Sequence, residues 1–273
     1  MYCINLKHRK DRWNRFQVQP GFRKLREIYP FEKFNAVLGN NLDIEGDSHI
    51  SNRTKRNIRD GIRRDHEDLD TKGGVGCYMS HYTVWKQFLE KDSEKYCLIF
   101  EDDTIIPAQF PPAFQVYFQE FKQRDIADLW FLYNPRSLYT YNKTGNMNIY
   151  EENQKDGLWI KGVCSGFPCY LISKKAAKVL IDDAFPIEMH VDMYSCLLND
   201  MKKLRTVFHT RIYVSLFNTG DSDTDIHSES KCKICDIPNN FYDKGYTMVN
   251  VPYLYFAGAA IIALWLFSQQ MRK

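Results

Sequence analysis

The sequence has no stretch at its start that resembles a secretory leader, because only about five apolar residues precede a charged run. It also has no internal repeat and no low-complexity linker, which favours one main domain in a chain of 273 residues. A G-x-x-x-x-G-K-S/T loop and paired-histidine motifs are missing, which argues against a phosphohydrolase or a nucleotidyltransferase. The net charge of +3 is too small to indicate a nucleic-acid-binding protein.

The cysteines do not form the pattern of a structural zinc site. Most of the eight cysteines lie within apolar runs, where free cysteines behave as small hydrophobic residues. This distribution favours a reducing compartment. Cys232 and Cys235 form one C-x-x-C pair without a second pair at zinc-ligand spacing, so we do not predict zinc there.

One long apolar run is present, close to the C-terminus. Residues 251–267 contain no charge, carry Trp265 near their end, and precede a short basic tail at residues 268–273. A run of this length is near the lower limit for crossing a hydrocarbon layer of about 30 Å, so we expect a transmembrane helix, with a core helix as the alternative. Together with the missing leader, this predicts a cytosolic main domain, residues 1–250, associated with a membrane through its C-terminus.

Apolar segments typical of strands alternate with segments of helical periodicity. Strands are expected at residues 2–6, 34–38, 96–101 and 128–133, a strand pair at 158–173 and a late strand at 206–217, with helices between them. Residues 43–73 fit either an exposed helix or a flap. This order predicts an α/β fold whose sheet is flanked by helices, has parallel strands at its centre, and binds ligands beyond the carboxyl ends of the strands.

Three consecutive carboxylates, Glu101, Asp102 and Asp103, follow the apolar residues 98–100. Carboxylates at the end of a buried strand repel one another unless a cation lies among them. A solvated turn or a helix cap is the simpler explanation, and a divalent metal site is the other. Because alternate side chains of an extended chain share a face, we expect Glu101 and Asp103 to point together, with Asp103 as the main ligand of the metal and Glu101 either as a second ligand or as a neighbour that contacts the ligands. Hard carboxylate oxygens suit Mn²⁺ or Mg²⁺.

Four segments in order along the chain carry a family resemblance. They are INLKHRKDRW at residues 4–13, GGVGCYMSHYTVWKQFLE at 73–90, YCLIFEDD at 96–103 and SGFPCYLISKKAAKVLI at 165–181. Together they resemble glycosyltransferase family 25, which includes lipopolysaccharide-biosynthesis galactosyl- and glucosyltransferases and collagen hydroxylysine galactosyltransferases, and which also occurs in large DNA viruses. The resemblance spans most of residues 2–200, and no single segment would carry it alone.

The resemblance implies a GT-A-like nucleotide-sugar-binding domain, built on a mixed sheet flanked by helices, that performs an inverting, metal-dependent transfer. The donor would be a UDP-sugar, and the transferred group a hexose, with galactose or glucose favoured. The acceptor would be a hydroxyl group of a glycan, a lipid-linked glycan or a protein. The implied cofactor is Mn²⁺ or Mg²⁺, which would stabilise the negative charge of a diphosphate leaving group. One alternative of another class is a catalytically inactive, membrane-anchored glycan-binding or scaffold protein on the same fold.

The resemblance also implies roles for residues outside the pair of metal ligands. Arg9 or Arg12 would face the diphosphate, or else both only solvate the start of a helix. His81 would reach the donor as a catalytic residue, although a histidine on an aromatic-rich helix is commonly a packed residue. The other residues placed at the donor are Asn5, Gly39, Gly76, Ser80 and Asp102. Gly76 would let the backbone approach the ligand, Gly39 occupies a position at which the family contacts the nucleotide base, and Asp102 would be directed towards ribose or the donor sugar.

Inverting transfer requires a general base beside the acceptor hydroxyl, and this base is usually a carboxylate. The segment PIEMHVDMY, residues 186–194, resembles the later acidic motif of the family and offers Glu188, His190 and Asp192. We select Asp192 as the base, with a helix cap as its competing role. A late histidine, His209 or His227, is a candidate to complete the metal shell.

Overall fold

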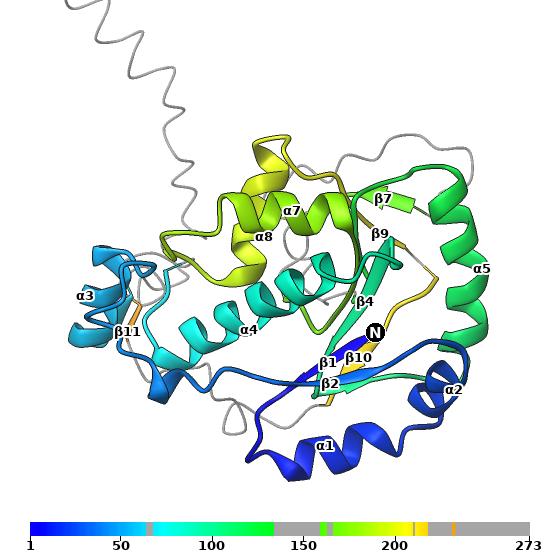
Figure 1. Cartoon of the computed structure of the whole chain (residues 1–273), viewed down its shortest axis with the longest axis horizontal. Helices are drawn as coiled ribbons and strands as arrows, with labels where there is room; N and C mark the ends of the chain where they lie inside the picture. Colours follow the sequence, from blue (N-terminus) through cyan, green and yellow to red (C-terminus); the bar gives the residue numbers. More distant parts are fainter. Residues whose placement is uncertain (64–67, 134–158, 163–165, 210, 218–230, 233–273) are drawn as a thin grey trace, which may run out of the picture.

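The computed structural model describes residues 1–63, 68–133, 159–162, 166–209, 211–217 and 231–232. Within these residues the chain forms a mixed β-sheet with helices on both faces (Figure 1), so the predicted α/β class is confirmed. The apolar segment at residues 251–267 and the basic tail lie outside the described residues. Among the helices that the structure describes, none is long and apolar enough to cross a membrane.

The main sheet has the strand order β2-β1-β4-β8-β6-β9-β7. These strands span Glu32–Asn35, Tyr2–Asn5, Tyr96–Glu101, Cys169–Ser173, Leu129–Phe131, Thr206–His209 and Trp159–Lys161, respectively. β2, β1 and β4 run parallel, whereas β8 runs antiparallel to both of its neighbours. The prediction of parallel strands at the centre is therefore wrong for β8. Its residues are buried on both faces and give an apolar run that carries no information about strand direction.

Two strand predictions differ from the structure in detail. β2 ends at Asn35, three residues earlier than expected, because the chain leaves the sheet and the Val37 N–H group donates to Ser80 Oγ at 2.8 Å. The expected strand pair at residues 158–173 does form two strands, β7 and β8. They do not pair with each other, since β6 and β9 lie between them in the sheet.

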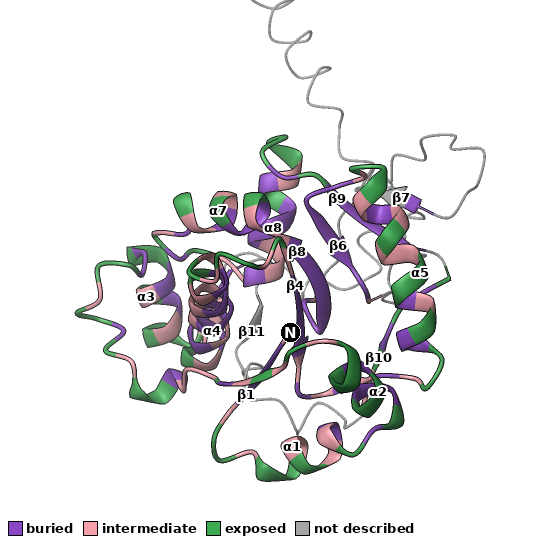
Figure 2. Ribbon diagram, turned by 45° about the vertical axis from the view of Figure 1, so that its right-hand side comes forward, coloured by how far each residue is buried: buried purple, intermediate pink, exposed green. Residues whose placement is uncertain are grey.

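The alternation of side chains along the strands divides the core into two layers. One layer packs against α4, α7 and α8, which span Lys72–Leu89, Lys174–Asp182 and Val191–Asp200. The other packs against α1, α2 and α5, which span Lys10–Gln17, Pro20–Ile28 and Phe110–Gln123. Along β4, for example, Ile99 belongs to the first layer and Phe100 to the second. Figure 2 shows buried strands between helices whose outer sides are exposed.

Residues 43–63 contain a short helix, α3, at Asn52–Asp60, so the helix alternative is the one observed there. Ser51 caps α3 by accepting a hydrogen bond from Thr54 N–H at 3.1 Å, and Gly61 ends it in the left-handed conformation with φ 62°. The remaining short elements are η1 (Gly39–Asn41), the parallel pair β3 (Ile62–Arg63) and β11 (Lys231–Cys232), and the antiparallel pair β5 (Thr104–Ile105) and β10 (Ser215–Leu216).

Gly76 lets α4 pack closely against the segment that follows β2. A Cβ atom at Gly76 would lie 2.7 Å from the carbonyl oxygen of Val37 and 2.7 Å from the amide nitrogen of Gly39. Gly76 was predicted to let the backbone approach a ligand. Instead, it lets one part of the backbone approach another, a distinction that a glycine in a sequence pattern does not reveal.

We expect Gly76→Ala to lower the free energy of unfolding by about 2 kcal/mol, since overpacking of this kind commonly costs about 1–3 kcal/mol. The matched variant is Gly74→Ala, whose new methyl group would meet the side chain of Leu69 rather than backbone atoms. Urea unfolding of both variants measures the difference. A loss for Gly76→Ala that is no larger than the loss for Gly74→Ala would contradict this interpretation.

Candidate functional site

The carboxyl ends of β2, β1 and β4 meet at one edge of the sheet and border a cavity of about 410 Å³. Residues of α4 form another wall of this cavity. Of the predicted site residues, those that line it are Arg12, Gly39, Ser80, His81, Glu101, Asp102 and Asp103. The first loop, which follows β1, the helix α4 and the acidic cluster Glu101–Asp103 are separate segments of the sequence. The fold brings them together around the cavity.

Asp102 is held by two side chains from the N-terminal part of the chain. Its Oδ2 atom accepts a hydrogen bond from Asn5 Nδ2 at 2.6 Å, and its Oδ1 atom accepts one from Arg12 Nη1 at 3.1 Å. Burial raises the pKa of Asp102, and these two donors oppose the rise. All three residues were predicted to contact the donor. Their observed contacts are with one another, and they fix the first loop to the acidic cluster.

Asp103 lies beside the same arginine but has one carboxylate oxygen without a hydrogen bond. Arg12 Nη1 is 3.9 Å from Asp103 Oδ2, whereas Oδ1 is buried and has no partner among the described residues. Burial, followed by repulsion from Glu101 and Asp102, raises the pKa of Asp103 to about 7. A divalent cation would relieve this repulsion and supply the missing partner, so the residues present fit a metal ion.

A chain of hydrogen bonds from the core orients Glu101. Its Oε1 atom is 3.1 Å from His81 Nε2, His81 Nδ1 is 2.8 Å from the Tyr170 hydroxyl, and Trp85 Nε1–H donates to that hydroxyl at 2.9 Å. Because a carboxylate only accepts, we assign the proton of the neutral ring to Nε2, and Nδ1 then accepts from Tyr170. His81 was predicted to be catalytic. Both of its ring nitrogens bind protein side chains, so its contacts are those of a residue that orients Glu101.

Cys77 also lines the cavity, although no sequence motif predicts a role for it. Cys77 lies one turn before His81 on α4, so the two side chains share a helical face. Burial raises the pKa of the Cys77 thiol, and repulsion from Glu101, Asp192 and Asp103 adds to the rise. The spacing of Cys77 and His81 is visible in the sequence. Their common neighbour Glu101 comes from a different element, and only the fold reveals it.

Two further residues predicted to bind the donor have partners in the protein. Arg9 donates to the carboxylate of Asp11 through Nε at 3.1 Å and Nη2 at 2.9 Å, which corresponds to the helix-start alternative. The Ser80 hydroxyl donates to the carbonyl oxygen of Gly76 at 2.7 Å and accepts from Val37 N–H. The Ser80 contacts join α4 to the segment after β2, and both of these segments line the cavity.

Asp192 lies in the first turn of α8, after the N-cap residue His190. Its Oδ2 atom accepts a hydrogen bond from Gly166 N–H at 2.6 Å, so the carboxylate binds a separate segment and Asp192 is not the N-cap residue. Asp192 does not line the cavity. Its charge nevertheless acts on the Cys77 thiol, which places it close to the wall that α4 forms.

His209 lies in an aromatic part of the core and does not line the cavity, so it does not complete the metal shell there. Its ring centroid is 4.1 Å from that of Tyr117 and 4.7 Å from that of Trp159, and its Nδ1 atom accepts from Arg211 N–H at 3.1 Å. The other candidate, His227, lies outside the described residues.

We expect His209 to make the fold sensitive to acid. Burial lowers its pKa to about 4, with Arg211 acting in the same direction and Glu120 opposing it. The stabilising effect of neutral His209 is complete above its unfolded-state pKa of 6.5 and is lost as the pH falls towards 4, with a loss of roughly 2 kcal/mol between pH 7.5 and 5. His209→Gln, which cannot titrate, should lose less stability in urea unfolding between pH 7.5 and 5. An equal loss in both proteins would contradict this assignment.

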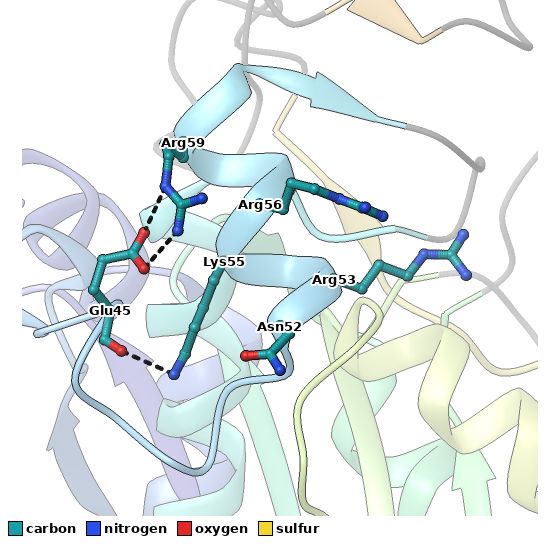
Figure 3. Close-up of a pocket in the computed structure, with 6 residues that line it drawn as sticks. All are labelled: Glu45, Asn52, Arg53, Lys55, Arg56 and Arg59. Carbon is teal, nitrogen blue, oxygen red and sulfur yellow. Dashed lines mark hydrogen bonds and ion pairs between the residues drawn. The ribbon is translucent and has the colours of Figure 1, made fainter.

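A second hollow, of about 570 Å³, lies along α3 and is lined mainly by basic side chains (Figure 3). Arg59 donates to the Glu45 carboxylate at 3.3 and 2.7 Å, and Lys55 donates to the Glu45 carbonyl oxygen at 2.9 Å. Arg53 pairs with Asp68 at 2.8 Å. These cations are engaged in contacts within the protein, and the acidic cluster of the cavity is not part of this hollow.

Comparison with known proteins assigns the region that forms the cavity to a family. The family model described as "Glycosyltransferase family 25 (LPS biosynthesis protein)" matches residues 1–195. "Procollagen galactosyltransferase 1-A" of Xenopus laevis is 30% identical over 130 residues, which cover 47% of this chain and 18% of the relative. "Procollagen lysyl hydroxylase and glycosyltransferase" of Acanthamoeba polyphaga mimivirus is 26% identical over 216 residues, which cover 74% of this chain and 22% of the relative.

A further relative is "Procollagen galactosyltransferase 2" of Homo sapiens, 32% identical over 114 residues that cover 40% of this chain and 16% of the relative. The matching region thus spans about a fifth of the length of these curated relatives. The family model includes every residue that lines the cavity, and it also reaches Asp192. The chain belongs to glycosyltransferase family 25.

Proposed function

We propose that this chain transfers a hexose, galactose or glucose, from a UDP-sugar to a hydroxyl group of a glycan or protein acceptor, with inversion at the anomeric carbon. Membership of family 25 supports a sugar transfer, and the names of the procollagen galactosyltransferase relatives favour galactose. Because the names of all three relatives specify procollagen, a hydroxyl group in a collagen-like protein is the first acceptor to test.

The observation that carries the proposal is the state of Asp103 in the cavity. A carboxylate with an unpartnered buried oxygen, a pKa raised to about 7 and two acidic neighbours is suited to bind a cation. A site built only for structure would gain nothing from this repulsion. The proposed ligands of Mn²⁺, or of Mg²⁺, are Asp103 and Glu101, since hard carboxylate oxygens suit both ions.

The metal would supply charge stabilisation for the diphosphate that leaves as the glycosidic bond breaks. The protein contributes the fixed geometry of its ligands. Arg12 and Asn5 anchor Asp102, so the turn that carries Asp103 is tied to the first loop. His81, held by Tyr170, sets the orientation of Glu101. Preorganised groups of this kind need little rearrangement during the reaction.

Asp192 is the proposed general base. Its carboxylate would take the proton from the acceptor hydroxyl as the oxygen attacks the anomeric carbon. The hydrogen bond from Gly166 N–H leaves the second carboxylate oxygen, Oδ1, available for that proton. Asp192 and the acidic residues Glu101 and Asp103 all act on the thiol of Cys77, so the proposed base lies near the proposed metal ligands.

The proposal also includes association with a membrane through the apolar residues 251–267, with the transferase domain in the cytosol.

The test of the function is donor turnover by the purified full chain with UDP-galactose, UDP-glucose and GDP-sugars, with and without Mn²⁺ and a collagen-like acceptor. Metal-stimulated turnover of one UDP-sugar is expected. Binding of a glycan without turnover of any donor would overturn the enzyme proposal and favour an inactive glycan-binding protein.

A further inference from the structure

We propose that Cys77, His81 and Glu101 form a second cation site in the cavity, which binds a thiophilic divalent cation such as Zn²⁺. A ligand atom from each residue lies within 4.8 Å of the other two. Thiolate sulfur, imidazole nitrogen and carboxylate oxygen bind Zn²⁺ at about 2.0–2.3 Å, so tetrahedral ligands stand roughly 3.3–3.8 Å apart. Side-chain movements of about 1 Å therefore suffice to close the site around the ion.

The backbone already presents the three ligands from rigid elements. Cys77 and His81 stand one turn apart on α4, and Glu101 ends β4. All three residues line the cavity, so the fourth coordination position would face it and take a water molecule or a ligand. Three protein ligands with one open position is a common arrangement for Zn²⁺.

His81 has the outer contacts that a zinc ligand requires. Its Nδ1 atom is 2.8 Å from the Tyr170 hydroxyl, and that hydroxyl also accepts from Trp85. When Nε2 binds a cation, the ring proton moves to Nδ1 and is donated to the Tyr170 oxygen. Such a partner fixes the ring orientation and the tautomer of a metal-binding histidine.

The new site shares Glu101 with the proposed Mn²⁺ site but differs in its other ligands. Mn²⁺ favours carboxylate oxygens, here from Asp103 and Glu101, whereas Zn²⁺ favours the sulfur and nitrogen of Cys77 and His81. The two ions compete for one carboxylate. It follows, if the proposed function holds, that Zn²⁺ inhibits Mn²⁺-dependent turnover through Cys77.

The test uses Co²⁺ as a probe for Zn²⁺, because a thiolate bound to Co²⁺ gives a charge-transfer absorption band. The full chain carries Cys232→Ser and Cys235→Ser, since that C-x-x-C pair offers thiolates of its own. We expect one equivalent of Co²⁺ to produce the band and Zn²⁺ to remove it. Cys77→Ser should abolish the band and weaken Co²⁺ binding more than about 100-fold. Loss of a residue that only hydrogen-bonds to a metal ligand already lowers metal affinity by about 10–100-fold, and Cys77 is itself a ligand.

The matched control is Cys196→Ser, which replaces a buried cysteine on α8, a helix that does not line the cavity. It should leave the band unchanged. Glu101→Gln keeps the thiol and should keep the band while weakening Co²⁺ binding, which covers the case in which Cys77→Ser does not fold. A missing band with Cys77 intact, or a band that survives Cys77→Ser, would overturn the site.

Cation binding is measured without a donor or an acceptor, so it is independent of the proposed function. A Co²⁺ band in a protein that turns over no sugar donor would refute the transferase proposal and leave the site standing. If Zn²⁺ inhibits turnover equally in the wild type and in Cys77→Ser, the competition for Glu101 is refuted and the transferase proposal stands.

Discussion

Asp103→Asn is expected to abolish metal-dependent turnover and at the same time to stabilise the metal-free protein. Loss of a carboxylate that holds the metal should lower turnover by about 10²-fold or more, because stabilisation of the leaving diphosphate is lost. The gain in stability follows from the raised pKa of Asp103, about 7 against an ordinary value of 3.8. Folding disfavours the ionised carboxylate, and asparagine removes that penalty.

The pH dependence of this gain has a defined sign. An acid whose folded-state pKa is raised opposes folding increasingly as the pH rises from about 4 to 7, and the effect is constant above 7. The variant should therefore exceed the wild type by little at pH 4 and by roughly 1–3 kcal/mol at pH 8, which is a few degrees in melting temperature.

Thermal unfolding in a metal chelator at several pH values measures the gain, and added Mn²⁺ should raise the melting temperature of the wild type but not that of Asp103→Asn. Asp92→Asn, at an exposed position before β4, is the matched control. It should match the wild type both in its melting temperature without metal and in its stabilisation by Mn²⁺. A variant that keeps Mn²⁺-stimulated turnover, or that is less stable than the wild type at pH 8 without metal, would refute the assignment of Asp103.

Local patterns in the sequence predict most of the strands and the position of the acidic cluster at the end of β4. Apolar runs place β1, β4 and β6 within a few residues, since buried strands require such runs wherever they lie in the sheet. The position of β8 between β4 and β6 follows from long-range pairing, and the pattern of a fully buried strand is the same in either direction.

At the site, too, local sequence patterns predict the position of residues but not the contacts of their side chains with distant residues. The prediction that the acids lie beyond a strand end holds, and so does their meeting with α4. The predicted direction of Asp102 towards the donor did not anticipate that Asn5 and Arg12 take up both of its oxygens. Hydrogen bonds between residues so distant along the chain leave no local signal, and Cys77 became a candidate only through its distance from Glu101.

Asp192→Asn is expected to lower the turnover number for transfer by about 10²–10⁴-fold, the usual contribution of a general base. The amide oxygen can still accept the hydrogen bond from Gly166 N–H, so the change removes the basic group and keeps the shape. Affinity for UDP and Mn²⁺ should stay the same, since Asp192 does not line the cavity that would hold them. Initial rates with the acceptor and calorimetric titration with UDP measure the two quantities separately.

Glu188→Gln is the matched control, because it removes an exposed carboxylate just before α8 and should leave transfer unchanged. Azide separates the base from a merely structural role, since this anionic nucleophile needs no deprotonation before it attacks the anomeric carbon. Asp192→Asn should therefore form the glycosyl azide of inverted configuration at the wild-type rate. If azide transfer falls together with acceptor transfer, the variant has displaced the segment at Gly166, and Asp192 acts through its hydrogen bond instead of as a base.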